Sequence, residues 1–344
     1  MNKSNISFGV WFLGLFLILL LVMVLNLSLG SVSIPFKTTI QVLFGKEPET
    51  ASWSYIILNY RLPKALTAII VGGGLAVSGL LMQTLFRNPL AGPFVLGVSS
   101  GASLGAAFLL MGTSLFTGWA LFESINDISL AIASSLGSFA VLLVVVIVAN
   151  RVRDTMTLLI IGLMFGSITA AVVSVLAYFS DAEKLQRFIF WSFGSVGGLS
   201  WSQLGILTLV VVFGLFFAIL SLKSLNAFLL GENYAKSLGI ALKKSRFLII
   251  AATGLIAGGI TAFAGPIAFV GLAVPHLTRQ FFNTMDHRIL LPAVFVYGAI
   301  LMLLCDTIAQ LPTSAKVLPI NAITSIIGAP VVIWLLLRKR KLFF

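Results

Sequence analysis

The chain has 344 residues, of which 59% are hydrophobic and 9% are charged, and its formal net charge is +12. A soluble domain carries charge on about a quarter of its residues, whereas about 20 consecutive apolar residues are enough to cross a bilayer. The composition therefore excludes an ordinary soluble domain and predicts an all-α, polytopic membrane protein. The lack of alternating strand patterns argues against a membrane barrel, and the basic excess indicates membrane topology rather than a nucleic-acid partner.

Ten apolar segments are long enough to span the membrane, and we expect them to form a single transmembrane domain over residues 1–344. The first follows Lys3 and is longer than the apolar core of a signal peptide, so we expect it to be retained as a helix. The second is expected to begin near Pro63, because proline suits the first turn of a helix. The predicted spans are 8–29, 63–83, 93–112, 128–150, 157–179, 202–222, 247–263, 267–283, 289–309 and 319–337.

The distribution of basic residues predicts the orientation of these spans. If the N-terminus lies inside, about two thirds of the 22 Lys and Arg residues fall on inner segments, among them Arg153 and the tail at 338–341. Basic residues are retained preferentially on the cytoplasmic side of a membrane. Both termini are therefore predicted to be cytoplasmic.

Glycine recurs at every fourth position of the third predicted span, at Gly97, Gly101 and Gly105, with Ser100 among them. Such a stripe favours close helix packing in lipid, where small residues let backbones approach. The alternative is that the same positions line a translocation path that must move.

A short motif occurs twice, as Ala91-Gly92-Pro93 and as Ala264-Gly265-Pro266, each before a predicted span. In the predicted topology an odd number of spans separates the two copies. A duplicated unit would then be inverted in the bilayer, as is common in transporters. A chance match is the alternative.

The segment 223–246 is a long polar interruption that is rich in lysine and contains one acid, Glu232. Its short apolar clusters predict one or two short helices along a membrane surface, broken at Gly231 and Gly239, because glycine readily adopts the left-handed turn that ends a helix. We interpret the segment as a cytoplasmic contact through which a partner protein drives the membrane helices. An ordinary basic loop on anionic membrane lipid is the alternative.

The sequence offers little chemistry of its own. Asp306 is the only acid within a predicted span, and it lies near the outer end, where we expect it to pair with a polar group. A secondary carrier coupled to an ion gradient would need this acid. His276, His287 and Cys305 do not have the spacing of a metal cluster, and no phosphate-binding loop motif occurs. We therefore predict no catalytic, cofactor or metal site, and a membrane enzyme is the least favoured class.

Two basic residues, Arg61 and Lys64, lie at the predicted outer end of the second span, against the positive-inside trend. Either side chain could bind an acidic partner surface, or could anchor the helix at lipid headgroups. The residues alone leave both uses open.

Taken together, several motifs resemble the membrane permeases of type II ABC importers for iron–siderophore complexes, haem and cobalamin. The resemblance runs from about Arg61 to Lys341. The matching residues are Arg61-Leu62-Pro63-Lys64, Ser78-Gly79, Gln83, Arg87-Asn88-Pro89-Leu90-Ala91, Leu96-Gly97-Val98-Ser99-Ser100-Gly101-Ala102, Gly231, Ala235, Leu238-Gly239, Ile267-Ala268-Phe269-Val270-Gly271-Leu272, Pro275-His276, Arg279, Asp286-His287-Arg288, Asp306, Leu318-Pro319-Ile320 and Ile327-Gly328-Ala329-Pro330.

The resemblance implies a multi-pass permease of about ten helices in the bacterial cytoplasmic membrane, moving a ferric siderophore or a related chelate by alternating access. The implied partners are a second permease chain, identical or homologous, two cytoplasmic ATPase subunits and an extracellular substrate-binding protein. The residues that would carry the ATPase contact are Leu230, Gly231, Glu232, Ala235, Leu238 and Gly239. An ion-coupled secondary transporter of a small solute is the alternative function.

By the same resemblance, Arg61 and Lys64 would dock acidic side chains of the binding protein. The chain departs from the family pattern at Gln310, where a basic residue is common, and we expect nearby Lys316 to take over that contact. It also departs at Val317, Asn321 and Gly92.

We predict that a reporter domain fused after Arg340 lies on the cytoplasmic side, because the inner segments carry most of the basic residues. A paired set of fusions, one active only in the cytoplasm and one active only outside, measures this directly. Activity of the external reporter would contradict the predicted topology.

Overall fold

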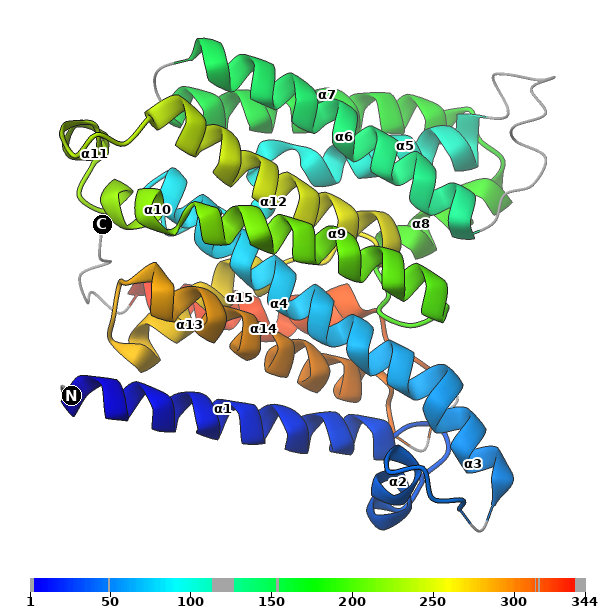
Figure 1. Cartoon of the computed structure of the whole chain (residues 1–344). Helices are drawn as coiled ribbons and strands as arrows, with labels where there is room; N and C mark the ends of the chain where they lie inside the picture. Colours follow the sequence, from blue (N-terminus) through cyan, green and yellow to red (C-terminus); the bar gives the residue numbers. More distant parts are fainter. Residues whose placement is uncertain are drawn as a thin grey trace. The chain divides into compact units, whose positions relative to one another are not determined.

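The computed structural model describes residues 3–48, 50–112, 127–152, 155–312, 314 and 316–337. All regular structure in these residues is helical (Figure 1), which confirms the all-α prediction. Arg153 and the basic tail at 338–341, both used for the topology, lie outside the described residues.

Each of the ten predicted spans corresponds to a helix in the described part of the chain. Seven described helical segments are long and apolar enough to cross a membrane. They contain α1 (Lys3–Ser28), α4 (Leu62–Leu85), α6 (Asp127–Arg151), α7 (Thr155–Tyr178), α9 (Trp201–Leu220), α12 (Leu242–Ala264) and α14 (His287–Ala309). The remaining three spans match shorter helices, α5 (Val98–Met111), α13 (Val270–Phe282) and α15 (Ile320–Leu337). The connecting helices are α2 (Phe36–Leu43), α3 (Ala51–Ile56), α8 (Ala182–Ser192), α10 (Leu222–Phe228) and α11 (Glu232–Ser237).

The start of the second span is a correction to the sequence analysis. The helix does not begin at Pro63, because a continuous apolar segment runs from Ala51 to Leu85. A single π-helical turn, η1 (Ile57–Arg61), joins α3 to α4 directly before the proline. Proline has no N–H to donate to the preceding turn, and the rare π-helix occurs mostly as single turns of this kind inside α-helices.

The described chain forms two compact units. Unit 1 contains the described parts of Met1–Val77, Ser195–Thr208 and Ala268–Lys339, and unit 2 contains those of Ser78–Gly194 and Leu209–Ile267. The prediction of one permease domain over residues 1–344 stays a prediction.

In unit 2, α5 packs between α6 and α7, side by side with both (Figure 1). The contact with α6 is so close that a β-carbon on Gly105 would lie 2.0 Å from the carbonyl oxygen of Ala133. One on Gly101 would lie 2.5 Å from the carbonyl oxygen of Gly137. Only a residue without a β-carbon fits at either place, so these glycines serve the helix packing that their spacing predicts.

In unit 1, α1 lies beside α14, and α13 and α15 also pack on α14. A second glycine contact joins α4 to α14, where a β-carbon on Gly72 would lie 2.3 Å from the carbonyl oxygen of Gly298. Likewise, a β-carbon on Gly298 would lie 2.4 Å from the carbonyl oxygen of Gly72. This pair was not predicted from the sequence, because the two glycines belong to separate spans and share no local pattern.

The two copies of the Ala-Gly-Pro motif precede similar structures, one in each unit. The first leads through a 3₁₀ turn, η2 (Pro93–Leu96), to Gly97, whose φ is +71°, and then to the 14-residue α5. The second leads to Phe269, whose φ is +66°, and then to the 13-residue α13. This shared local geometry agrees with a duplicated unit, and its inversion in the membrane stays a prediction.

We predict that Gly105→Ala lowers the thermal unfolding temperature of the detergent-purified protein, because the added β-carbon would push the Ala133 carbonyl away. Gly205→Ala is the matched control, since a β-carbon on Gly205 in α9 meets nothing within 4 Å. Alanine is better than glycine inside a helix by about 1 kcal/mol, so the control should unfold at the same temperature or higher. Equal unfolding temperatures for the two variants would contradict the close α5–α6 contact.

Candidate functional site

A buried polar cluster in unit 1 surrounds Asp306, and we call Asn26, Lys64, Asp306 and Gln310 the Asp306 cluster. Asp306 is only 2% exposed. Its carboxylate accepts hydrogen bonds from the Asn26 amide at 3.0 Å and the Gln310 amide at 2.7 Å, and it forms an ion pair with the Lys64 ammonium at 3.0 Å. The predicted pairing of Asp306 with polar groups is thereby confirmed. The cluster ties α1, α4 and α14 together at one end.

Arg61 is also turned inward. Its side chain is buried, and its guanidinium donates to the carbonyl oxygens of Leu27 at 2.7 Å and Ser28 at 2.9 Å, and to that of Val32. α1 ends at Ser28, so Arg61 satisfies the last carbonyls of that helix. Its positive charge also interacts favourably with the partial negative charge at the C-terminal end of the helix. An acidic partner would have to compete with these carbonyls, so the docking role of Arg61 stays a prediction.

The two lysines of the predicted docking set differ in access. The Lys64 side chain is 21% exposed despite its ion pair with Asp306, and Lys316 is exposed. Gln310, which occupies the position where the family often has a basic residue, uses its amide to bind Asp306. Gln310 follows Asp306 by four residues, a spacing from which their hydrogen bond could have been predicted. Nothing in the sequence predicts the contact of Asn26 with Asp306.

The polar interruption after α9 folds as predicted, into α10 and α11, with breaks at Gly231 (φ +103°) and Gly239 (φ +79°). We call residues 222–240 the α10–α11 segment. Leu230, Tyr234 and Leu238, spaced four residues apart, are exposed by 63%, 51% and 57%. Exposed apolar side chains gathered in this way suit contact with another protein. Tyr234 was missed from the sequence. Gly231 separates Leu230 from α11, so the spacing of four residues does not place the three side chains on one helix.

Two other predicted ATPase-contact residues point into the protein. Ala235 is buried. The Glu232 carboxylate accepts hydrogen bonds at 2.6 Å, through both oxygens, from one guanidinium nitrogen of Arg246. Gly231 is half-buried, and Gly239 is exposed. The contact role of this set stays a prediction, but only part of the set faces outward.

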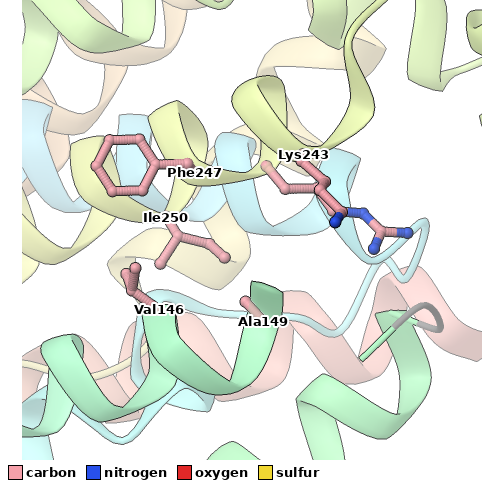
Figure 2. Close-up of a pocket in the computed structure, with 6 residues that line it drawn as sticks. Val146, Ala149, Lys243, Phe247 and Ile250 are labelled. Carbon is pink, nitrogen blue, oxygen red and sulfur yellow. The ribbon is translucent and has the colours of Figure 1, made fainter. Parts of the chain in front are cut away.

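A small pocket lies between α6 and α12 next to Arg246 (Figure 2). Figure 2 shows Lys243 at one end and Phe247 at the other, with Val146 and Ala149 on the facing helix. Ile250 and Arg246 complete the lining. Within the described residues, no group of three or more His, Cys, Asp or Glu side chains is placed to hold a metal ion.

The predicted path residues lie at helix contacts inside unit 2. A β-carbon on Gly97 would be 3.2 Å from the carbonyl oxygen of Gly162, and one on Gly166 would be 3.4 Å from the Ser100 hydroxyl oxygen. The stripe on α5 therefore meets α7 as well as α6. These contacts agree with the packing interpretation, and a role in a translocation path stays a prediction.

Known proteins similar to this chain are membrane permeases. The profile of the FecCD transport family matches residues 18–338. The vitamin B12 import system permease protein BtuC of Klebsiella pneumoniae is 38% identical over 331 residues, covering 96% of this chain and 94% of the relative. The hemin transport system permease protein HmuU of Yersinia pestis is 35% identical over 332 residues, covering 96% of each chain. A solved structure described as an inward-facing conformation of a metal-chelate type ABC transporter has a TM-score of 0.81 at 32% identity, covering 95% of this chain and 98% of its own.

We predict that Asp306→Asn destabilises the protein by about 3 kcal/mol, because removing one partner of a buried ion pair leaves the other charge uncompensated. The unfolding temperature in detergent should fall, and the double variant Asp306→Leu with Lys64→Met should recover much of the loss, since apolar replacement of both partners is often neutral. Asp181→Asn, which breaks the more exposed pair with Lys184 at 3.1 Å, is the control and should change stability by less than about 1 kcal/mol. Equal effects of the two single variants would contradict the structural role of the cluster.

Proposed function

The chain belongs to the FecCD transport family, and from this premise we propose that it carries an iron–siderophore complex, or a related metal chelate, inward across the bacterial cytoplasmic membrane. It is a multi-pass membrane permease of an ABC importer and not an enzyme, with ATP hydrolysis on a separate subunit. We further propose that both termini lie in the cytoplasm and that access to the cargo path alternates between the two sides.

The observation that carries the ATP-driven mechanism is the exposed row of Leu230, Tyr234 and Leu238 on the α10–α11 segment. Large apolar side chains exposed on a short connecting segment are typical of a surface that contacts another protein. We assign this row to contact with the ATPase. The proposed assembly contains two ATPase subunits, a second permease chain, identical or homologous, and an extracellular binding protein.

The proposed cargo class is a bulky metal chelate. The relatives are named for vitamin B12 and hemin, and the similar solved structure for a metal chelate. In this chain, the candidate path positions are Gly97, directly before α5, and Ser100, Gly101 and Gly105 on α5, which offer one side-chain hydroxyl among them. So few hydrogen-bonding groups suit a path of low selectivity, with the choice of chelate made by the binding protein.

For docking of the binding protein, we propose Lys316 and Lys64 as the direct contacts. Lys316 is exposed, and the partly exposed Lys64 ammonium carries further N–H groups beyond the one aimed at Asp306. Arg61 would support docking from behind, by holding the end of α1 and the carbonyl of Val32.

The alternative, an ion-coupled carrier, receives no support from Asp306. The carboxylate is buried at one end of α14 and engaged by three donors, Asn26, Lys64 and Gln310. A coupling acid must exchange protons or sodium ions with a path during the cycle.

We predict that vesicles containing the permease, its ATPase and its binding protein accumulate a ferric siderophore only when ATP is present on the ATPase side. Uptake of hemin and of cyanocobalamin is measured in separate samples of the same vesicles. Uptake that continues without the ATPase, or that follows an imposed ion gradient, would overturn the ATP-driven function. If the vesicles take up hemin or cyanocobalamin but not the ferric siderophore, the iron–siderophore assignment is overturned and the permease function stands.

The same vesicles test the docking surface. Lys316→Glu should weaken capture of the binding protein by about tenfold or more, since like charges then face each other across the interface. Lys46→Glu is a control of the same charge change at another exposed lysine on the predicted outer side. Equal binding by both variants and the parent would remove Lys316 from the docking set.

A further inference from the structure

We propose that the ion pair between Glu232 and Arg246 is the strut through which the α10–α11 segment moves α12. The inference rests on the proposed ATP-driven function and goes beyond it, because it assigns Glu232 to transmission inside the permease rather than to contact with the ATPase. Both residues are positioning residues, since the role proposed for them acts through α12.

The first step is the geometry of the pair. Both Glu232 oxygens lie 2.6 Å from the same Arg246 nitrogen, and the two side chains are 32% and 10% exposed. Glu232 is the only acid between positions 223 and 246. Charge-assisted hydrogen bonds of this length are among the strong ones in proteins, so the pair fixes one point of α11 to the start of α12.

A second contact fixes the neighbouring helix. The hydroxyl oxygens of Ser224 in α10 and Ser245 in α12 are 2.7 Å apart. Ser245 and Arg246 are adjacent, so both anchors of the α10–α11 segment attach to one place near the N-terminal end of α12. The exposed row Leu230, Tyr234 and Leu238 carries no such attachment to α12. These two contacts, together with the short connection from α11 to Leu242, link a push on that row to the first turns of α12.

The second step is the packing of α12 on the rest of unit 2. A β-carbon on Gly254 would lie 2.4 Å from the Leu142 side chain of α6. One on Gly258 would lie 3.2 Å from both Ser138 of α6 and Val98, the first residue of α5. Tightly packed helices shift as bodies because packed interiors are stiff. α12 therefore joins the strut to the start of α5.

The start of α5 is the last element in this chain of contacts. α5 follows directly on Gly97, whose φ of +71° turns the chain out of the 3₁₀ turn η2. Ser138 also donates to the carbonyl oxygen of Val98 at 2.9 Å, which ties this turn to α6. A displacement of α12 thus reaches the hinge-like start of the helix that carries the candidate path residues. The chain of contacts is continuous within unit 2.

The experiment measures cargo transported per ATP hydrolysed in the vesicles described above. Glu232→Gln should raise the ATP consumed per cargo about tenfold, while the ATPase still co-purifies, because the exposed row is intact. The charge-swapped double variant Glu232→Arg with Arg246→Glu should restore at least half of the parent ratio. Glu183→Gln is the control, since it breaks an exposed pair with Arg187 at 2.7 Å on α8 and should leave the ratio unchanged.

One result would overturn the strut: a Glu232→Gln variant whose ratio of cargo to ATP equals that of the parent, whether or not uptake and hydrolysis have both fallen. If Glu232→Gln does not fold, the swapped variant decides: a folded swap with parental coupling supports the strut, and a folded but uncoupled swap overturns it. Failure of the proposed function is recognised separately, because the unmodified permease would then show no ATP-dependent uptake.

Discussion

Close approach of helix backbones at glycine is the contact on which the described structure depends. Between α5 and α6 the approach leaves no space for a β-carbon at Gly101 or Gly105, and between α4 and α14 the same holds at Gly72 and Gly298. Lipid tails are as apolar as the side chains they would replace, so helices in a bilayer gain little by hiding apolar surface from lipid. Packing at such distances supplies the attraction instead, and it sets where each helix end lies.

Two ion pairs lie near the ends of the long helices. The buried Asp306 pairs with Lys64, and the half-buried Glu232 pairs with the buried Arg246. An isolated charge would be costly at either place, so each buried carboxylate is matched by a cation. The Asp306 cluster joins helices within unit 1, while the Glu232 pair joins a connecting segment to a long helix within unit 2.

This arrangement suits a permease that is driven from outside itself. At the α10–α11 segment Leu230, Tyr234 and Leu238 are exposed. Lys223 and Lys236 are exposed as well, whereas Glu232 is paired with Arg246 of α12. In our proposal, recognition of the ATPase and transmission of its motion use different residues of one short segment. A substitution can in principle remove either property alone, which makes the two roles separable by measurement.

By itself, the sequence determined the membrane class, the ten helical segments and the glycine breaks at Gly231 and Gly239, because these follow from apolar length and local backbone freedom. Only the tertiary structure decided where the ionisable side chains point. Asn26 and Asp306 are 280 positions apart, and no local pattern reveals that they meet. The inward turn of Arg61 onto the end of α1, and of Glu232 onto Arg246, likewise depends on which helices pack together. Periodicity records the environment of a residue along its own helix, whereas a partner across the fold is fixed only when the helices have assembled.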